Sequence, residues 1–315
     1  MNNKLTSLTT AALLSSAMGT AYAADPSHLE HPHSAGTMMF EFQYMRMNMD
    51  GILSGTTDRT QASVLESGYD GAPKSMSMDM FMLMPMYNIT RELSVMLMAN
   101  FLANDMQMTG HAMETSGVGD TSISLSYKFL DDSFAASLET SIPTGDTAVK
   151  TAMMHGDHMM NMTSPYAMQL GSGTYDLTPS LAYLGAYYTL RYGAMVSYTY
   201  RVGTNNSDYA LGDKTKFMTW IRKPVAGVTL DAVLTASYSG ALEGEHKSIV
   251  DKTMSYTADN ANYGSTSIAD VSVGATLPVG PVSVGAKVGM PVYQKLNGIQ
   301  MKRGWTATAS VAAMF

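Results

Sequence analysis

The chain has 315 residues, of which 45% are apolar and 14% charged, and its formal net charge is −7. This composition excludes a disordered protein, which needs fewer apolar residues and more charge. The absence of cysteine excludes disulfide scaffolds, thiolate metal sites and cysteine nucleophiles, and the acidic balance argues against nucleic acid as a partner.

The first segment, residues 1–23, has the pattern of a secretory signal peptide. Lys4 precedes an apolar and small-residue run, and residues 21–23 (Ala-Tyr-Ala) supply the small–x–small pattern of a cleavage site. We therefore expect cleavage after residue 23 or 24 and export of the mature chain. Residues 24–37 are expected to form a periplasmic N-terminal segment. It contains three histidines, His28, His31 and His33.

The remaining residues, 38–315, are predicted to form β-strands. From Thr121 to Phe129, apolar and polar residues alternate with the period of two expected of a strand with one apolar face. The same alternation predicts about twelve strands, near residues 38–49, 77–87, 93–102, 120–130, 134–142, 174–183, 188–202, 214–223, 228–239, 266–277, 282–293 and 304–315.

The connections between these strands alternate in length. Short turns such as Asn88–Glu92 and Asp131–Ser133 alternate with long segments such as Ala103–Gly119 and Pro143–Gly173. Outer-membrane barrels have short periplasmic turns, longer outside loops and an even number of strands. The sequence therefore predicts an all-β protein, a transmembrane antiparallel barrel of about twelve strands in the outer membrane of a Gram-negative bacterium, with both termini periplasmic.

The last predicted strand supports the same fold. Its apolar residues occupy alternate positions and the chain ends at Phe315. A terminal aromatic residue of this parity resembles the signal that the barrel-assembly machinery recognises. We therefore expect two partners for the mature chain, the lipid bilayer of the outer membrane and the assembly machinery, which would bind the C-terminal strand.

Four segments resemble a known outer-membrane family. They are GVGDTSISLSY at Gly117–Tyr127, IPTGD at Ile142–Asp146, MQLGSGTYDL at Met168–Leu177 and YMRMNMDG at Tyr44–Gly51. The first three are similar to the family named for meta-pathway phenol degradation, often labelled transporters, and the fourth to a methionine-rich subgroup. The resemblance covers most of the mature chain and implies an outer-membrane conduit. It does not imply phenol chemistry, because the family name records neighbouring genes.

If the apolar parity of each strand faces lipid, the opposite parity faces the lumen. That parity directs five acids and five bases inward: Glu41, Lys128, Glu139, Asp176, Arg191, Arg201, Arg222, Asp231, Asp270 and Lys287. Ionisable groups at membrane depth must pair or be hydrated. We interpret them as a structural network that fills a narrow barrel or, alternatively, as a polar eyelet with weak charge selectivity. For Glu139 and Asp176, pairing with Arg191 or Lys128 is expected.

The first three strands direct methionine inward instead. On these strands, acidic and amide residues mark the positions that face the lumen, and aromatic residues mark those that face lipid. The methionines on the lumen-facing positions are predicted to form one shared wall. Its members are Met45, Met47, Met49, Met78, Met80, Met82, Met84, Met86, Met96 and Met98. The second strand is apolar on both faces, so a slip of one residue would turn its methionines to lipid.

Methionine and histidine also occur together beyond the predicted wall. One predicted outside loop holds Met106, Met108, His111 and Met113, and another holds Met153, Met154, His155, His158, Met159, Met160 and Met162. Thioether and imidazole can bind copper(I) when thiolates are absent. We interpret both clusters as metal-binding, with copper(I) as ligand or substrate and no cofactor required. Methionine as a flexible apolar filler is the alternative.

Catalysis is not supported by the sequence. All seven histidines fall in the N-terminal segment or in predicted outside loops, and neither a GxSxG nor a GxxxxGK[ST] motif occurs. We therefore expect no enzyme but an outer-membrane channel or transport component for an ion or small molecule, with a soft metal such as copper(I) as the leading substrate. The alternatives are a conduit for small hydrophobic or aromatic compounds and a structural or adhesive barrel with a closed lumen.

Overall fold

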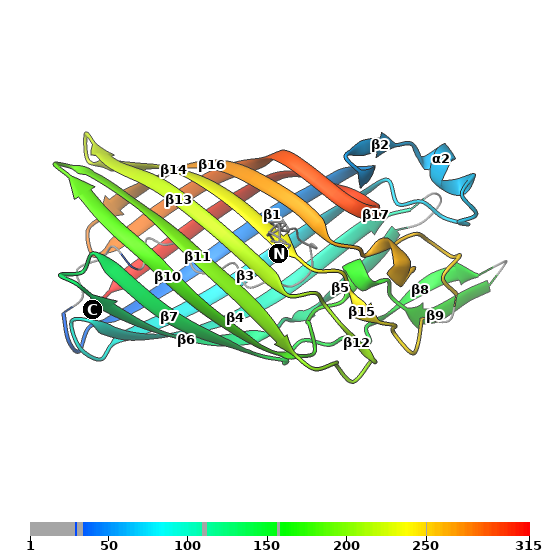
Figure 1. The fold of residues 1–315 in the computed structure, drawn as a ribbon, viewed down its shortest axis with the longest axis horizontal. Coiled ribbons are helices and arrows are strands. Elements are labelled where there is room, and N and C mark those ends of the chain that lie inside the picture. Colours follow the sequence, from blue (N-terminus) through cyan, green and yellow to red (C-terminus); the bar gives the residue numbers. More distant parts are fainter. Residues whose placement is uncertain (1–28, 30–33, 109–111, 156–157, 250) are drawn as a thin grey trace, which may run out of the picture.

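The computed structural model describes residues 29, 34–108, 112–155, 158–249 and 251–315. Within them the alternating strands form a closed antiparallel barrel whose strands are tilted to its long axis (Figure 1). Its strands are β1 (Met38–Gly55), β3 (Ser75–Asn88), β4 (Leu93–Gln107), β6 (Thr121–Phe129), β7 (Phe134–Ile142), β10 (Tyr175–Tyr187), β11 (Leu190–Val202), β13 (Lys214–Val225), β14 (Val228–Ser239), β16 (Thr266–Val279) and β17 (Val282–Met314).

The barrel closes between its first and last strands. The later part of β17 pairs with β1, and the backbone N–H groups of Met38 and Phe315 donate to each other's carbonyl oxygens at 3.0 and 2.8 Å. The earlier part of β17 pairs with β16. Because every neighbouring pair is antiparallel, a closed ring needs an even number of segments, so β17 fills two positions. The eleven strand elements thus occupy twelve positions, and the predicted fold class is confirmed.

The short turns lie at one end of the barrel together with the C-terminus, and the long connections lie at the other end (Figure 1). Local backbone geometry explains the short turns. Ala226 and Gly227 join β13 to β14 with φ values of +50° and +86°. Two successive left-handed residues make a type I′ turn, whose twist matches that of the flanking strands.

The long connections carry secondary structure that was not predicted. They contain β2 (Thr57–Arg59), α2 (Gln61–Leu65), β5 (Ala112–Val118), β8 (Lys150–His155), β9 (His158–Thr163), β12 (Tyr209–Ala210) and β15 (Glu243–Gly244), with short 3-10 turns at Tyr166–Met168 and Asn260–Asn262. Among the described residues, no helix is long and apolar enough to cross a membrane.

The outer face of the barrel is largely apolar, apart from an ion pair between Arg46 of β1 and Asp79 of β3. Phe42, Leu125, Val196 and Val273 are all between 47% and 55% exposed although they lie in the middle of strands. Aromatic rings gather at the short-turn end, where the centroid of Phe134 lies 5.8 Å from that of Phe129 and 5.4 Å from that of Tyr183. An apolar belt edged by aromatic rings is the surface that a barrel presents to lipid.

Candidate functional site: a methionine wall in the lumen

The inward face of β3 consists of methionine. Its six methionines, Met76 to Met86, are between 1% and 8% exposed, whereas Phe81 and Leu83 between them are 40% and 48% exposed. The predicted parity is therefore the observed one. Pairing with the neighbouring strand fixes it, because Met45 of β1 is the Cα partner of Met80.

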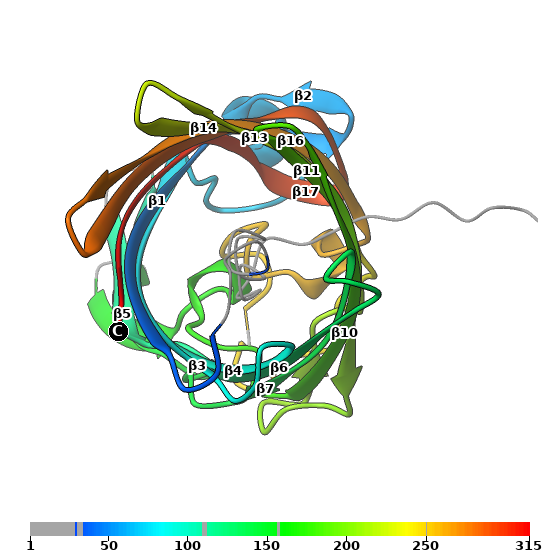
Figure 2. The same cartoon turned by 90° about the vertical axis from the view of Figure 1, so that its left-hand side faces the viewer.

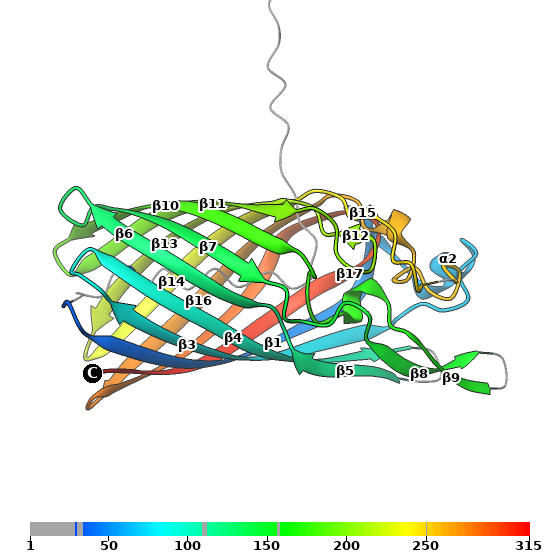
Figure 3. The same ribbon diagram turned by 90° about the horizontal axis from the view of Figure 1, so that it is seen from below.

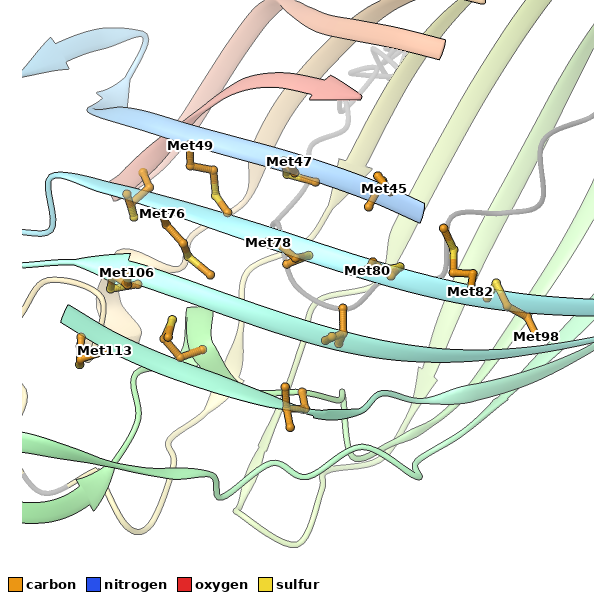
Figure 4. Packing of buried hydrophobic residues seen from close by; sticks show 14 of the residues in the cluster. Met45, Met47, Met49, Met76, Met78, Met80, Met82, Met98, Met106 and Met113 are labelled. Carbon is orange, nitrogen blue, oxygen red and sulfur yellow. The ribbon is translucent and has the colours of Figure 1, made fainter. Parts of the chain in front are cut away.

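Neighbouring strands extend this face into one continuous wall, shown in Figure 4. Cross-strand pairs bring the thioethers together, with Met86 opposite Met96. We call the following buried set the methionine wall: Met39, Met45, Met47, Met49, Met76, Met78, Met80, Met82, Met84, Met86, Met96, Met98, Met106, Met108, Met113, Met168 and Met301. The wall covers the inner faces of β1, β3, β4 and β5.

Met106 and Met113 lie in paired strands of the connection between β4 and β6 rather than in an irregular loop, and Met108 directly follows β4. β4 continues to Gln107 and β5 folds back on it, so Met106 and Met113 are Cα partners, 0% and 1% exposed. Their alternation continues that of the inward residues of β4, a signal already present in the sequence. His111 and the histidines of the N-terminal segment lie outside the described residues.

The second predicted cluster lies on a separate two-stranded hairpin, β8–β9, which extends past the end of the barrel in Figure 3. Its register pairs Met153 with Met160, Met154 with Met159 and His155 with His158. Met160 is exposed, whereas Met162 at the base of the hairpin packs against the methionine wall. The structure thus joins two methionine groups that the sequence analysis kept apart.

No group of three or more His, Cys, Asp or Glu side chains that could hold a metal ion occurs in the part of the chain that the structure describes.

The remaining strands carry the predicted ionisable residues on their inward faces. Ion pairs on these inward faces include Arg201 with Asp176, Lys287 Nζ with Asp231 Oδ2 at 3.1 Å, and Arg303 Nη2 with Asp270 Oδ1 at 3.1 Å. The expected pairing of Asp176 with Arg191 or Lys128 is wrong, because the β10–β11 register places Asp176 directly opposite Arg201. Glu41, Lys128, Glu139, Arg191 and Arg222 also lie on the inward parity.

Three further bases face the lumen but were not among the predicted residues. Lys214 and Lys216 share the parity of Arg222 on β13, so their position could have been predicted from the sequence. Arg303 could not, because a register shift in the β1–β17 pairing changes the face on which it lies.

Three of the four segments that carry the family resemblance meet at one buried carboxylate, Asp120. Its Oδ1 accepts from Gly145 N at 3.0 Å, and its Oδ2 accepts from both N and Oγ of Ser172 at 2.7 Å. The contact is close, because a Cβ on Gly171 would lie 2.4 Å from Asp120 Oδ1. We call this contact the Asp120 junction. It lies where β4 changes its partner from β6 to β5.

The ring of His246 is packed and hydrogen-bonded among the outside loops. Its ring is stacked on Tyr209 with centroids 5.4 Å apart, its Nε2 lies 2.7 Å from the Thr147 carbonyl oxygen, and its Nδ1 accepts from Ser248 N at 3.1 Å. Burial raises the pKa of Tyr209, so the phenol stays protonated beside it. These contacts hold three of the long connections together and engage both ring nitrogens.

No family model and no curated protein matches the chain. Solved structures do match its fold. An outer-membrane channel from Pseudomonas putida F1 is 13% identical, with a TM-score of 0.64, over 90% of this chain and 97% of that one. The β-domain of the Bordetella autotransporter BrkA is 11% identical (TM-score 0.49; 89% and 100% covered), and the P. putida toluene transporter TodX is 9% identical (TM-score 0.45; 93% of each covered).

The likeness to the P. putida F1 channel agrees with the closed ring and its apolar belt. The chain is therefore an outer-membrane β-barrel of the Gram-negative type, with its belt in the lipid bilayer and a methionine wall inside.

Proposed function

We propose that this barrel is an outer-membrane channel whose methionine wall passes a soft metal ion, copper(I) in first place. The observation that carries the proposal is the sorting of methionine by face. In β3 the inward positions are methionine while the outward positions include Phe81, Leu83 and Tyr87. If β3 used methionine as a general apolar residue, methionine would occur on both faces of this strand.

The chemistry of the side chain explains why the sorting matters. A wall that needs only to be apolar could use leucine, valine or phenylalanine, as the lipid face of the same strands does. Methionine differs from them in its polarizable sulfur, which binds soft metals. Thioethers are neutral ligands, so each site would hold copper(I) weakly, as a conducting path requires.

The spacing of the wall suits an ion that moves between sites. Successive methionines on one strand are about 6.6 Å apart along the chain, and directly opposed Cβ atoms are about 5 Å apart. Flexible side chains can close such gaps. Met45 and Met80, then Met47 and Met78, are successive cross-strand pairs of this kind.

The β8–β9 hairpin supports a capture step at the outside end. Its register pairs Met153 with Met160 and His155 with His158, and Met162 at the base of the hairpin packs against the methionine wall. A metal bound by the hairpin would therefore be delivered to the wall through Met162.

The test is isothermal titration of the purified barrel with silver(I) or copper(I). Replacing Met80, Met82 and Met84 with leucine keeps the apolar volume and removes the sulfur. We expect this variant to lose binding while its folding is unchanged. The matched control is Met290→Leu, because Met290 is a methionine 60% exposed on the lipid face. Absence of micromolar binding by the wild-type barrel would contradict the proposal.

A second candidate is a conduit for small hydrophobic or aromatic compounds. The methionine wall is apolar and little exposed, as the lining of a path for such compounds would be. The same triple leucine variant separates the two functions, because a hydrophobic substrate should tolerate it. A structural or adhesive barrel would transport neither.

We also propose that the chain is a methionine-rich member of the outer-membrane family named for meta-pathway phenol degradation. The convergence of three resembling segments on Asp120 supports this, since unrelated segments have no reason to share one carboxylate. Circular dichroism and gel mobility of Asp120 variants test whether the shared segments act as one unit.

A further inference from the structure

We infer that the wall opposite the methionines is electropositive and excludes hard cations from the lumen. The inference deepens the proposed function by naming what sets its selectivity. It rests on that function only for the identity of the metal that passes.

The two walls face each other across the barrel. In the ring order, β13 lies six positions from β3 in a ring of twelve, which is the opposite side. Figure 2 looks along the barrel and shows these strands on facing sides. The strand richest in inward methionine therefore faces the strand that carries Lys214, Lys216 and Arg222 on its inward parity.

Basic residues outnumber acidic residues on the inward strand faces that the structure describes. The bases there are Lys128, Arg191, Arg201, Lys214, Lys216, Arg222, Lys287 and Arg303, and the acids are Glu41, Glu139, Asp176, Asp231 and Asp270. Eight bases and five acids leave a formal balance of +3, although the formal net charge of the whole chain is −7. Of the acids, only Glu41 belongs to a strand of the methionine wall.

One arrangement places two bases side by side on this part of the wall. Arg191 and Arg222 are direct Cα partners on β11 and β13, and like charges in that position destabilise a sheet. Asp231 is the opposed partner of Arg222, but it also lies 3.1 Å from Lys287 Nζ. Gly274 makes room for that contact, because a Cβ there would lie 2.5 Å from Asp231 Oδ1.

Together, the methionine wall and the basic wall separate soft metal ions from hard cations. A hydrated sodium, potassium or magnesium ion gains nothing from thioethers and is repelled by the opposite wall. Copper(I) meets the same repulsion but is held by sulfur. The bases thus repel the abundant hard cations outside the cell, while anions and soft metal ions can still enter the lumen.

The experiment is single-channel recording of the full barrel in planar bilayers across a potassium chloride gradient at low ionic strength. We expect the reversal potential to have the sign of chloride preference. In water, a unit charge about 8 Å from the ion path changes the anion-to-cation ratio by about fivefold before screening, and salt near 0.1 M reduces this to about twofold. Replacing Lys214 and Lys216 with glutamine should therefore lower the chloride-to-potassium permeability ratio at least about twofold.

Lys223→Gln is the matched control, because Lys223 lies on the same strand with the opposite, outward parity. It should leave the ratio unchanged. Arg222→Gln provides a second inward variant if the double variant fails to insert. A cation-side reversal potential, no conductance, or an equal effect of the control would overturn the inference. Chloride preference in a barrel that binds no silver(I) would leave the inference standing and reject the metal proposal.

Discussion

Removal of the Asp120 carboxylate is expected to destabilise the outer end of the barrel strongly. Asp120 is 9% exposed and accepts three hydrogen bonds, from Gly145 N, Ser172 N and Ser172 Oγ. Hydrogen bonds to a charged acceptor contribute about 1.5 to 3 kcal/mol each, and donors left unpaired in a buried site add a desolvation cost. Partial relaxation of the loops lowers the total, so Asp120→Ala should reduce the free energy of unfolding by about 3 to 5 kcal/mol.

The assay is guanidinium unfolding of the barrel in lipid bilayers, followed by tryptophan fluorescence, with limited proteolysis of the loop around residue 145. Glu114→Ala is the control, because Glu114 is exposed on neighbouring β5. It should change stability by less than about 0.5 kcal/mol. A loss below about 1 kcal/mol in Asp120→Ala would refute the reasoning that the three segments are held together by this carboxylate.

Three further predictions concern topology, assembly and metal capture. Cysteines introduced at Thr204 and Lys247, at the long-loop end, should react with an impermeant thiol reagent on intact cells. A cysteine at Asp132, in a short turn, should not react. The reverse labelling pattern would invert the topology. Deletion of Phe315 should reduce membrane insertion because its backbone pairs with Met38, and Met314→Ser should be mild; equal insertion of the deletion and the wild type would remove the assembly signal. Serine at all five methionines of the β8–β9 hairpin should weaken silver(I) binding more than zinc binding, without unfolding the barrel; unchanged silver(I) affinity would exclude capture there.

The barrel and the parity of its strands could be predicted from the sequence because lipid imposes a strict alternation. Phe81 and Leu83 must face lipid, and the period of two then turns Met80 and Met82 inward. The same rule placed Asp176 and Arg201 in the lumen. Their mutual pairing depends on the register of β10 against β11, which the alternation alone does not determine.

Features beyond the membrane were predicted less well, since lipid no longer constrains them there. Met106 and Met113 continue the inward pattern, but β5 pairs with β4 outside any predicted strand. Arg303 faces the lumen only because of an irregular register. The Asp120 junction joins residues that are far apart in the sequence, and no local pattern indicates such a contact.

The central claim is that the methionine wall passes a soft metal, and silver(I) flux into liposomes that contain the purified barrel tests it most directly. We expect the wild type to admit silver(I) at a rate well above that of empty liposomes. The variant in which Met80, Met82 and Met84 are replaced with leucine should lose most of this flux, and Met290→Leu should retain it. Equal silver(I) flux through the triple variant and the wild type would contradict the account.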